Sequence, residues 1–249
     1  LVGSEMCIRD RYKQVAESDG LSLVSNDPII KNNQLFGSKT VFVESGKVAN
    51  VSLKFNRMGN TPKKWKEIKI NETAKCGIIG VTLETRPDMI NHQALLDFRM
   101  YNCTRVQIGI QSLNDKILKI NNRKCYLKDT KKAIRNLKGV GLKVVGHYMP
   151  DLPGSSPEID EDMFMQAVSD PNIQLDDWKI YPTAVVPYTK IQKKYESGEY
   201  TPYTEKNPSL LVDMMVRIKP LVPKWVRIER LIRDIPSTYI EAGYNGMIN

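Results

Sequence analysis

The stretch from Gly77 to Ser112 constrains the fold most, because it reads as one complete strand–helix–strand unit. Ile78–Leu83 is a short apolar run, typical of a strand that is buried on both faces. Pro87 cannot donate to a β-ladder and ends this strand, while Asn91 can cap the helix that follows. Arg105–Ile110 is the next apolar strand. Since such units are right-handed crossovers, the sequence predicts two parallel strands here.

Each of these two strands ends at a polar residue. Glu84 follows the first strand, and Gln111 follows the second. Parallel strands present their carboxyl ends at one edge of a sheet, and α/β proteins carry their chemistry at that edge. We therefore expect Glu84 and Gln111 to lie at the same functional rim.

The alternation of helices and strands continues after Ser112. Asn114 can cap a short helix, and Asp129 or Thr130 can cap a longer amphipathic one. Further strands are expected at Leu142–Val145, Trp178–Tyr181 and Trp225–Arg230, and further helices at Pro157–Val168, Thr189–Ser197 and Ser209–Leu221. Five strands that alternate with helices indicate a parallel α/β architecture over Asn71–Pro236.

The first part of the chain is the least informative. Leu1–Arg11 resembles a translated sequencing adapter, so we expect residues 1–11 to be an artefact rather than part of the fold. Residues 12–71 form a poorly defined segment. Within it, Thr40–Val43 and Val48–Phe55 are β-rich and flank a turn, which predicts a hairpin.

The charge and the cysteines of the chain bear on its partners and its compartment. The 249 residues carry a net charge of +9, which favours an anionic partner such as nucleic acid and fits an uninvolved basic surface equally well. No apolar run reaches the length of about 18 residues that a membrane span needs. The four cysteines include no C-x-x-C pair, which argues against a metal site made from this chain alone. A reducing, cytoplasmic compartment fits best.

Several strings in the second part of the chain resemble one protein family. GVTLETRPD, CTRVQIGIQS, GLKVVGHYMPDLPGS and DDWKIYPT are similar to strings of the family of Elongator catalytic subunits. Members of that family are radical S-adenosylmethionine enzymes fused to an acetyltransferase-type domain. The resemblance covers Asn71–Ala242 and implies a partial TIM-like (βα)6 barrel of parallel strands in residues 72–249. The first barrel strands and the acetyltransferase domain are expected to be missing from this chain.

The resemblance implies a cofactor site made by four residues. Glu84 would hold the ribose hydroxyls of S-adenosylmethionine, Gln111 would contact the cofactor near the ribose, and Arg123 suits its methionine carboxylate. His147 takes the strand-end position of the family's histidine. The residues alone leave structural roles open: a rim ion pair for Glu84, a helix cap for Gln111, a solvated Arg123 and an interior His147.

The resemblance also implies a reaction for the complete protein. A 4Fe–4S cluster reduces S-adenosylmethionine to a 5′-deoxyadenosyl radical, acetyl-CoA supplies the carbon, and C5 of the wobble uridine U34 in tRNA becomes carboxymethylated. The partners would be tRNA and other Elongator subunits. Four basic residues are candidates for a phosphate-facing surface, with ordinary surface charge as the alternative: Lys179, Arg227, Arg230 and Arg233.

The sequence also departs from the family. The three cysteines spaced C-x9-C-x2-C that hold the cluster are absent, so we expect the cluster ligands outside this chain and no activity from this chain alone. The loop around Arg123 continues with Lys124 and Cys125 where the family has a glycine and a histidine. Two other readings stay open. One is a radical S-adenosylmethionine enzyme of the oxygen-independent coproporphyrinogen oxidase type, and the other is a non-catalytic truncated paralogue that binds tRNA or another subunit.

Overall fold

A computed structural model describes residues 40–44, 68–74, 80–232, 235 and 237–244 of the chain. The expected artefact at residues 1–11 and the expected strand at Val48–Phe55 lie outside these ranges. None of the helices in the described ranges combines the length and the apolar character that a membrane span requires.

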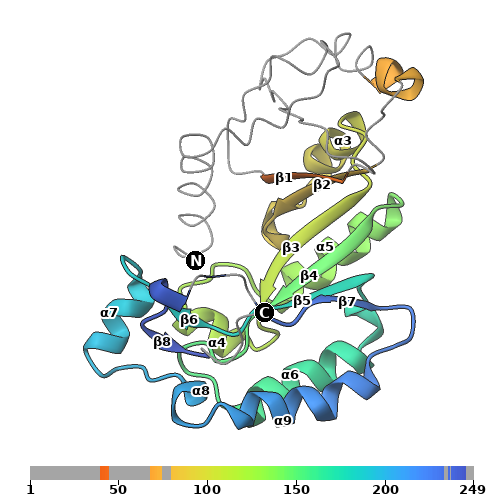
Figure 1. Cartoon of the computed structure of the whole chain (residues 1–249). Helices are drawn as coiled ribbons and strands as arrows, with labels where there is room; N and C mark the ends of the chain where they lie inside the picture. Colours follow the sequence, from red (N-terminus) through yellow and green to blue (C-terminus); the bar gives the residue numbers. More distant parts are fainter. Residues whose placement is uncertain (1–39, 45–67, 75–79, 233–234, 236, 245–249) are drawn as a thin grey trace.

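Strands and helices alternate along the described chain, as the sequence predicts (Figure 1). The strands are β1 Thr40–Glu44, β2 Gly80–Thr85, β3 Arg105–Gln111, β4 Lys143–Tyr148, β5 Asp177–Ile180, β6 Ala184–Val185, β7 Arg227–Arg230 and β8 Ala242–Gly243. The labelled α-helices are α3 His92–Met100, α4 Asp115–Ile120, α5 Leu127–Gly139, α6 Pro157–Ser169, α7 Lys190–Glu196, α8 Tyr203–Lys206 and α9 Ser209–Ile218. Residues 68–73 are also helical.

The main sheet has six strands in the order β1-β2-β3-β4-β5-β7. The strands β2, β3, β4, β5 and β7 are parallel, which confirms the predicted partial α/β barrel architecture. The strand β1 joins this sheet antiparallel to β2, with Thr40 opposite Glu84, a pairing that the sequence does not predict. The strands β6 and β8 form a separate antiparallel pair.

The two faces of this sheet differ in chemistry. On β3, Val106, Ile108 and Ile110 belong to the main apolar core, together with helix residues such as Leu137 and Phe164. Figure 1 shows α3, α5, α6 and α9 along this side of the sheet. Because strand residues alternate between faces, the residues between them point to the opposite side, which we call the inner face. The strand β3 is buried on both faces, but its second face is polar rather than apolar. The sequence predicts burial on both faces for Ile78–Leu83, and of the described residues there Val81, Thr82 and Leu83 are buried.

Side-chain caps fix where the helices begin. The side chain of Asn91 accepts a hydrogen bond from Ala94 N at 2.9 Å, and Asn114 accepts one from Lys116 N at 3.0 Å, as predicted. The expected cap of α5 by Asp129 or Thr130 is wrong. The helix begins at Leu127, and Asp129 instead reaches back from the first turn to accept a hydrogen bond from Tyr126 N at 2.9 Å.

Two buried aspartates tie the segment after β4 to α6 and α8. Asp151 accepts hydrogen bonds from Tyr203 N at 2.9 Å and from Thr204 N at 3.0 Å. Asp160 on α6 accepts hydrogen bonds from Asp151 N at 2.6 Å and from the Tyr203 hydroxyl at 3.0 Å. Burial raises the pKa of both carboxyl groups to about 6, because the charged form loses its water.

The apolar side of the sheet predicts a first mutational result. Leu137→Ala removes a fully buried side chain of α5 and should lower the free energy of unfolding by about 2–5 kcal/mol in urea denaturation. Leu96→Ala, at a position of α3 that is 46% exposed, is the control and should change it by less than about 1 kcal/mol. Equal losses in the two variants would contradict the packing described for α5.

The two aspartates predict a dependence of stability on pH. Their pKa values rise on folding from 3.8 to about 6, so the folded state binds more protons between these values, and stability falls as the pH increases from about 4 to 6. Asp160→Asn should reduce that fall in thermal unfolding experiments across this range. Asp162→Asn, at an exposed position of the same helix, should keep the wild-type profile. An unchanged profile in Asp160→Asn would refute this assignment.

Candidate functional site on the inner face of the sheet

The inner face of the sheet carries a line of polar side chains from five strands. Its members are Glu84 on β2, Gln107 on β3, His147 on β4, Lys179 on β5 and Glu229 on β7. Strand registry places His147 beside both Gly109 and Lys179, so these neighbours share one face. This line is the candidate functional site.

Gln107 is the centre of this line. Its Oε1 atom accepts a hydrogen bond from Lys179 Nζ at 3.1 Å and lies 2.9 Å from His147 Nε2. An amide oxygen only accepts, so the histidine proton is assigned to Nε2 from this contact. His147 Nδ1 then faces Glu84 Oε1 at 3.7 Å. Sequence analysis missed Gln107, although its place between buried Val106 and Ile108 gives the signal of a strand residue that faces the other side.

Lys179 lies inside the protein rather than on its surface. Lys179 is 8% exposed, and its Nζ atom lies 3.4 Å from Glu229 Oε1. Burial lowers the pKa of Lys179, and the charge of Glu229 opposes that shift. The expected phosphate-facing placement is therefore incorrect for this lysine. Its neighbours Trp178 and Ile180 face the apolar core, which directs Lys179 to the inner face.

Arg123 and Gln111 lie over the backbone of Gly109. The guanidinium of Arg123 reaches back from the loop after α4, and its Nη2 atom donates to Gly109 O. A Cβ at Gly109 would lie 2.8 Å from Arg123 Nη2 and 2.8 Å from Gln111 Nε2, closer than side chains pack. A side chain at this position would therefore force the Arg123 guanidinium and the Gln111 amide to shift. Arg123 is 5% exposed, so it is not simply solvated.

Gln111 adopts an unusual backbone conformation. Its φ is +71°, and the pairing between β3 and β4 shifts between Gly109 and Gln111. Its Oε1 atom is buried and has no hydrogen-bond partner among the residues that the structure describes. The next helix is capped by Asn114, so Gln111 is not that cap. A strained, buried amide at a strand end is typical of a ligand-contacting position.

The four residues expected to bind the cofactor therefore share one region. Gly109 is the strand neighbour of His147, and His147 faces Glu84. Arg123 and Gln111 lie over the same glycine. The structure thus brings Glu84, Gln111, Arg123 and His147 together at the carboxyl ends of β2, β3 and β4.

The arginines that could form a rim ion pair with Glu84 are Arg86 and Arg105, and both contact other acids. Arg86 pairs with Asp88, and Arg105 lies 3.7 Å from Asp177. Arg105 also donates a hydrogen bond to Thr82 Oγ1 at 3.2 Å, and Thr82 precedes Glu84 on strand β2. These arginines therefore help to order the sheet.

Two of the remaining basic candidates lie on the edge strand β7. Arg227 and Arg230 of β7 are exposed, as a phosphate-facing role requires. Arg233 lies outside the described residues.

The part of the chain that the structure describes contains no cluster of three histidine, cysteine or acidic side chains that could hold a metal ion. The cysteines Cys103 and Cys125 in it are buried, and burial raises the pKa of each thiol to about 11. Neither is therefore a ready thiolate ligand.

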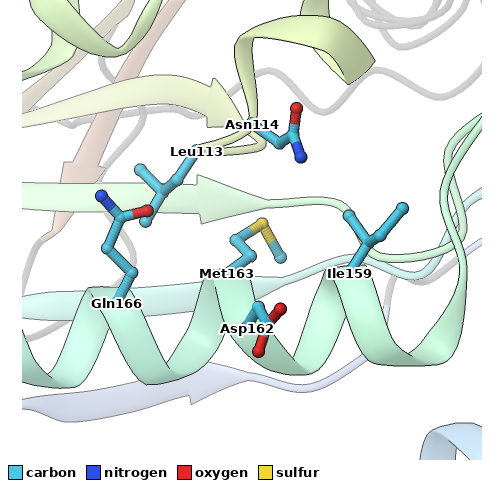
Figure 2. Close-up of a pocket in the computed structure, with 6 residues that line it drawn as sticks. All are labelled: Leu113, Asn114, Ile159, Asp162, Met163 and Gln166. Carbon is cyan, nitrogen blue, oxygen red and sulfur yellow. The ribbon is translucent and has the colours of Figure 1, made fainter.

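A surface pocket of about 290 Å³ lies away from this site, between α6 and the loop after β3 (Figure 2). Its lining residues are Leu113, Asn114, Ile159, Asp162, Met163 and Gln166. Figure 2 shows the α6 side chains on one side of the pocket and the loop residues on the other. It holds none of the expected site residues and does not mark the candidate site.

Comparisons with known proteins show which family the chain resembles. The profile of the Radical SAM superfamily matches residues 55–165, and that of the Radical_SAM C-terminal domain matches residues 175–249. A tRNA uridine(34) acetyltransferase of Methanocaldococcus infernus is 40% identical over 175 residues, which are 70% of this chain and 32% of the relative. Elongator complex protein 3 of Schizosaccharomyces pombe is 38% identical over 176 residues, 71% of this chain and 32% of the relative.

A solved structure agrees with the family indicated by these relatives. The archaeal Methanocaldococcus infernus Elp3 with an N-terminal deletion superposes with a TM-score of 0.68 at 39% identity, covering 72% of this chain and 41% of that one. This chain spans about a third of the length of the curated relatives it matches. These findings confirm the resemblance seen in the sequence. The chain belongs to the radical SAM superfamily, in the family of the tRNA uridine(34) acetyltransferases and Elongator complex protein 3.

Proposed function

We propose that this chain is the part of a tRNA-modifying enzyme that binds S-adenosylmethionine and positions the wobble uridine U34. Residues 72–249 would form this barrel part, as the sequence predicts. The observation that carries the proposal is the arrangement of Arg123 and Gln111 over Gly109, beside His147 and Glu84. The identity to tRNA uridine(34) acetyltransferases favours this function over that of a porphyrinogen oxidase.

The residues present fit S-adenosylmethionine. Glu84 offers carboxylate oxygens that suit two neighbouring ribose hydroxyls, and Arg123 offers a guanidinium for a carboxylate. The buried Oε1 atom of Gln111 can accept a hydrogen bond from the cofactor. The contact from Arg123 to Gly109 O fixes the guanidinium before the ligand arrives, which lowers the entropy cost of binding.

Bound S-adenosylmethionine with a reduced 4Fe–4S cluster supplies one-electron chemistry that can break an unactivated C–H bond. Because the described residues include no ligand set for a cluster, this part of the chain would supply contacts to the cofactor and the substrate. Gln107 would keep His147 and Lys179 in place through its hydrogen bonds, and His147 would face Glu84. The name of the relatives supports acetyl-CoA as the co-substrate.

The basic edge of the sheet would face the tRNA backbone. Arg227 and Arg230 are exposed on β7, and Arg233 follows them in the sequence. Arginine contacts to phosphates position a nucleic acid without reading its sequence. The net charge of +9 agrees with such a partner. Since relatives are named Elongator complex protein 3, we also propose other Elongator subunits as partners.

Cofactor binding can be tested through Gly109. Gly109→Ala places a Cβ against Arg123 and Gln111, and it should weaken S-adenosylmethionine binding about tenfold or more in isothermal titration calorimetry. Gly139→Ala is the matched control, because a Cβ there meets no atom within 4 Å. Equal affinities of the two variants for the cofactor would argue against this site.

RNA binding can be tested through the edge arginines. The double variant Arg227→Gln, Arg230→Gln should weaken binding of a tRNA anticodon stem–loop and lower the slope of log affinity against log salt by about two. Arg135→Gln, at an exposed position of α5, is the control for removing positive charge. A salt slope that is the same in all these proteins would place the RNA elsewhere.

A further inference from the structure

The proposed cofactor site uses only one half of the inner face. Glu84, Gln111, Arg123 and His147 come from β2, β3, β4 and the loop after α4. The other half, on β5 and β7, carries a buried lysine and a glutamate that this site does not use. We call Lys179 and Glu229 the inner-face pair.

Glu229 carries a buried acceptor that needs a donor. Its Oε1 atom lies 3.4 Å from Lys179 Nζ. Its Oε2 atom is also buried, but it has no hydrogen-bond partner among the residues that the structure describes. A buried carboxylate oxygen without a donor is costly, so such an atom in a functional site indicates a ligand that brings the donor.

The inner-face pair lies next to the proposed cofactor site. Gln107 Oε1 contacts both His147 Nε2, at 2.9 Å, and Lys179 Nζ, at 3.1 Å. His147 belongs to the cofactor half and Lys179 to the pair, so one oxygen atom links the two halves. A group held by the pair would therefore lie beside the cofactor, as the target of a radical reaction must.

The chemistry of the pair selects among the possible ligands. An acceptor at Glu229 Oε2 beside a donor at Lys179 Nζ matches an N–H group next to a C=O group. The imide edge of uracil has this pattern, with N3–H between two carbonyl groups. An acetyl thioester has a carbonyl but no N–H, and it would leave Glu229 Oε2 without a donor.

We propose that the inner-face pair holds the target uracil, with Glu229 accepting a hydrogen bond from N3–H and Lys179 donating to the adjacent carbonyl oxygen. This inference rests on the proposed function and adds the residues that recognise the base. The base must leave its stack to enter, as bases do in other enzymes that act on them. The hydrogen bonds to the imide edge leave C5 of the ring uncovered.

The test compares two anticodon stem–loop RNAs, one with uridine and one with 3-methyluridine at the wobble position. The methyl group removes the N3–H donor. In fluorescence anisotropy, the wild-type 249-residue chain should bind the uridine RNA about tenfold more tightly. Glu229→Ala should reduce this preference to less than about twofold.

Further variants separate recognition from folding. Glu229→Gln keeps the size of the side chain and one neutral acceptor, so it should show an intermediate preference for uridine. Glu199→Ala removes an exposed glutamate whose side chain is 61% accessible and should keep the wild-type preference. Circular dichroism of each variant checks that the fold is intact, and Glu229→Gln replaces Glu229→Ala if the latter does not fold.

The outcomes distinguish this inference from the proposed function. If the wild type binds the uridine RNA but Glu229→Ala keeps the full preference, the inference is overturned and the proposed function stands. If the wild type binds both RNAs equally, the pair does not read N3–H, and the inference is again overturned. If the wild type binds neither RNA, the proposed function fails and this assignment fails with it.

Discussion

The burial of Lys179 is the constraint on which the inner face depends. An ammonium group inside a protein needs partners that replace its water, and Lys179 finds them in Gln107 Oε1 and Glu229 Oε1. The same oxygen of Gln107 also contacts His147. One amide therefore joins side chains from β3, β4 and β5, and the loss of Gln107 would remove a hydrogen-bond partner from both His147 and Lys179.

Much of the fold is predictable because local signals and long-range packing agree. Pro87 ends the strand region before it, Asn91 and Asn114 cap the helices where the sequence places them, and the five parallel strands appear where apolar runs predict them. The antiparallel placement of β1 is different, because its partner is chosen by contacts between distant segments. No local pattern in Thr40–Glu44 indicates that choice.

The site was predictable only in part. Glu84 and Gln111 follow from the rule that strand ends meet, but Arg123 depends on how a loop folds back over Gly109. Lys179 shows the limit most clearly. In a short strand such as Asp177–Ile180, a lysine between two apolar residues fits a surface edge and an enclosed polar face equally well. The choice depends on which side the helices cover, and that is a property of the whole sheet.

The position of Arg123 on a loop has a consequence for dynamics. Arg123 N bonds to Leu118 O at the end of α4, and its guanidinium bonds to Gly109 O on β3. The cofactor end of the sheet is therefore complete only while this loop is docked. Thermodynamic linkage makes this coupling reciprocal. If docking of the loop increases the affinity for a ligand at Arg123, binding of that ligand stabilises the docked loop by the same free energy. Hydrogen exchange of the segment between α4 and α5 would thus report on occupancy of the site, although the segment belongs to neither strand.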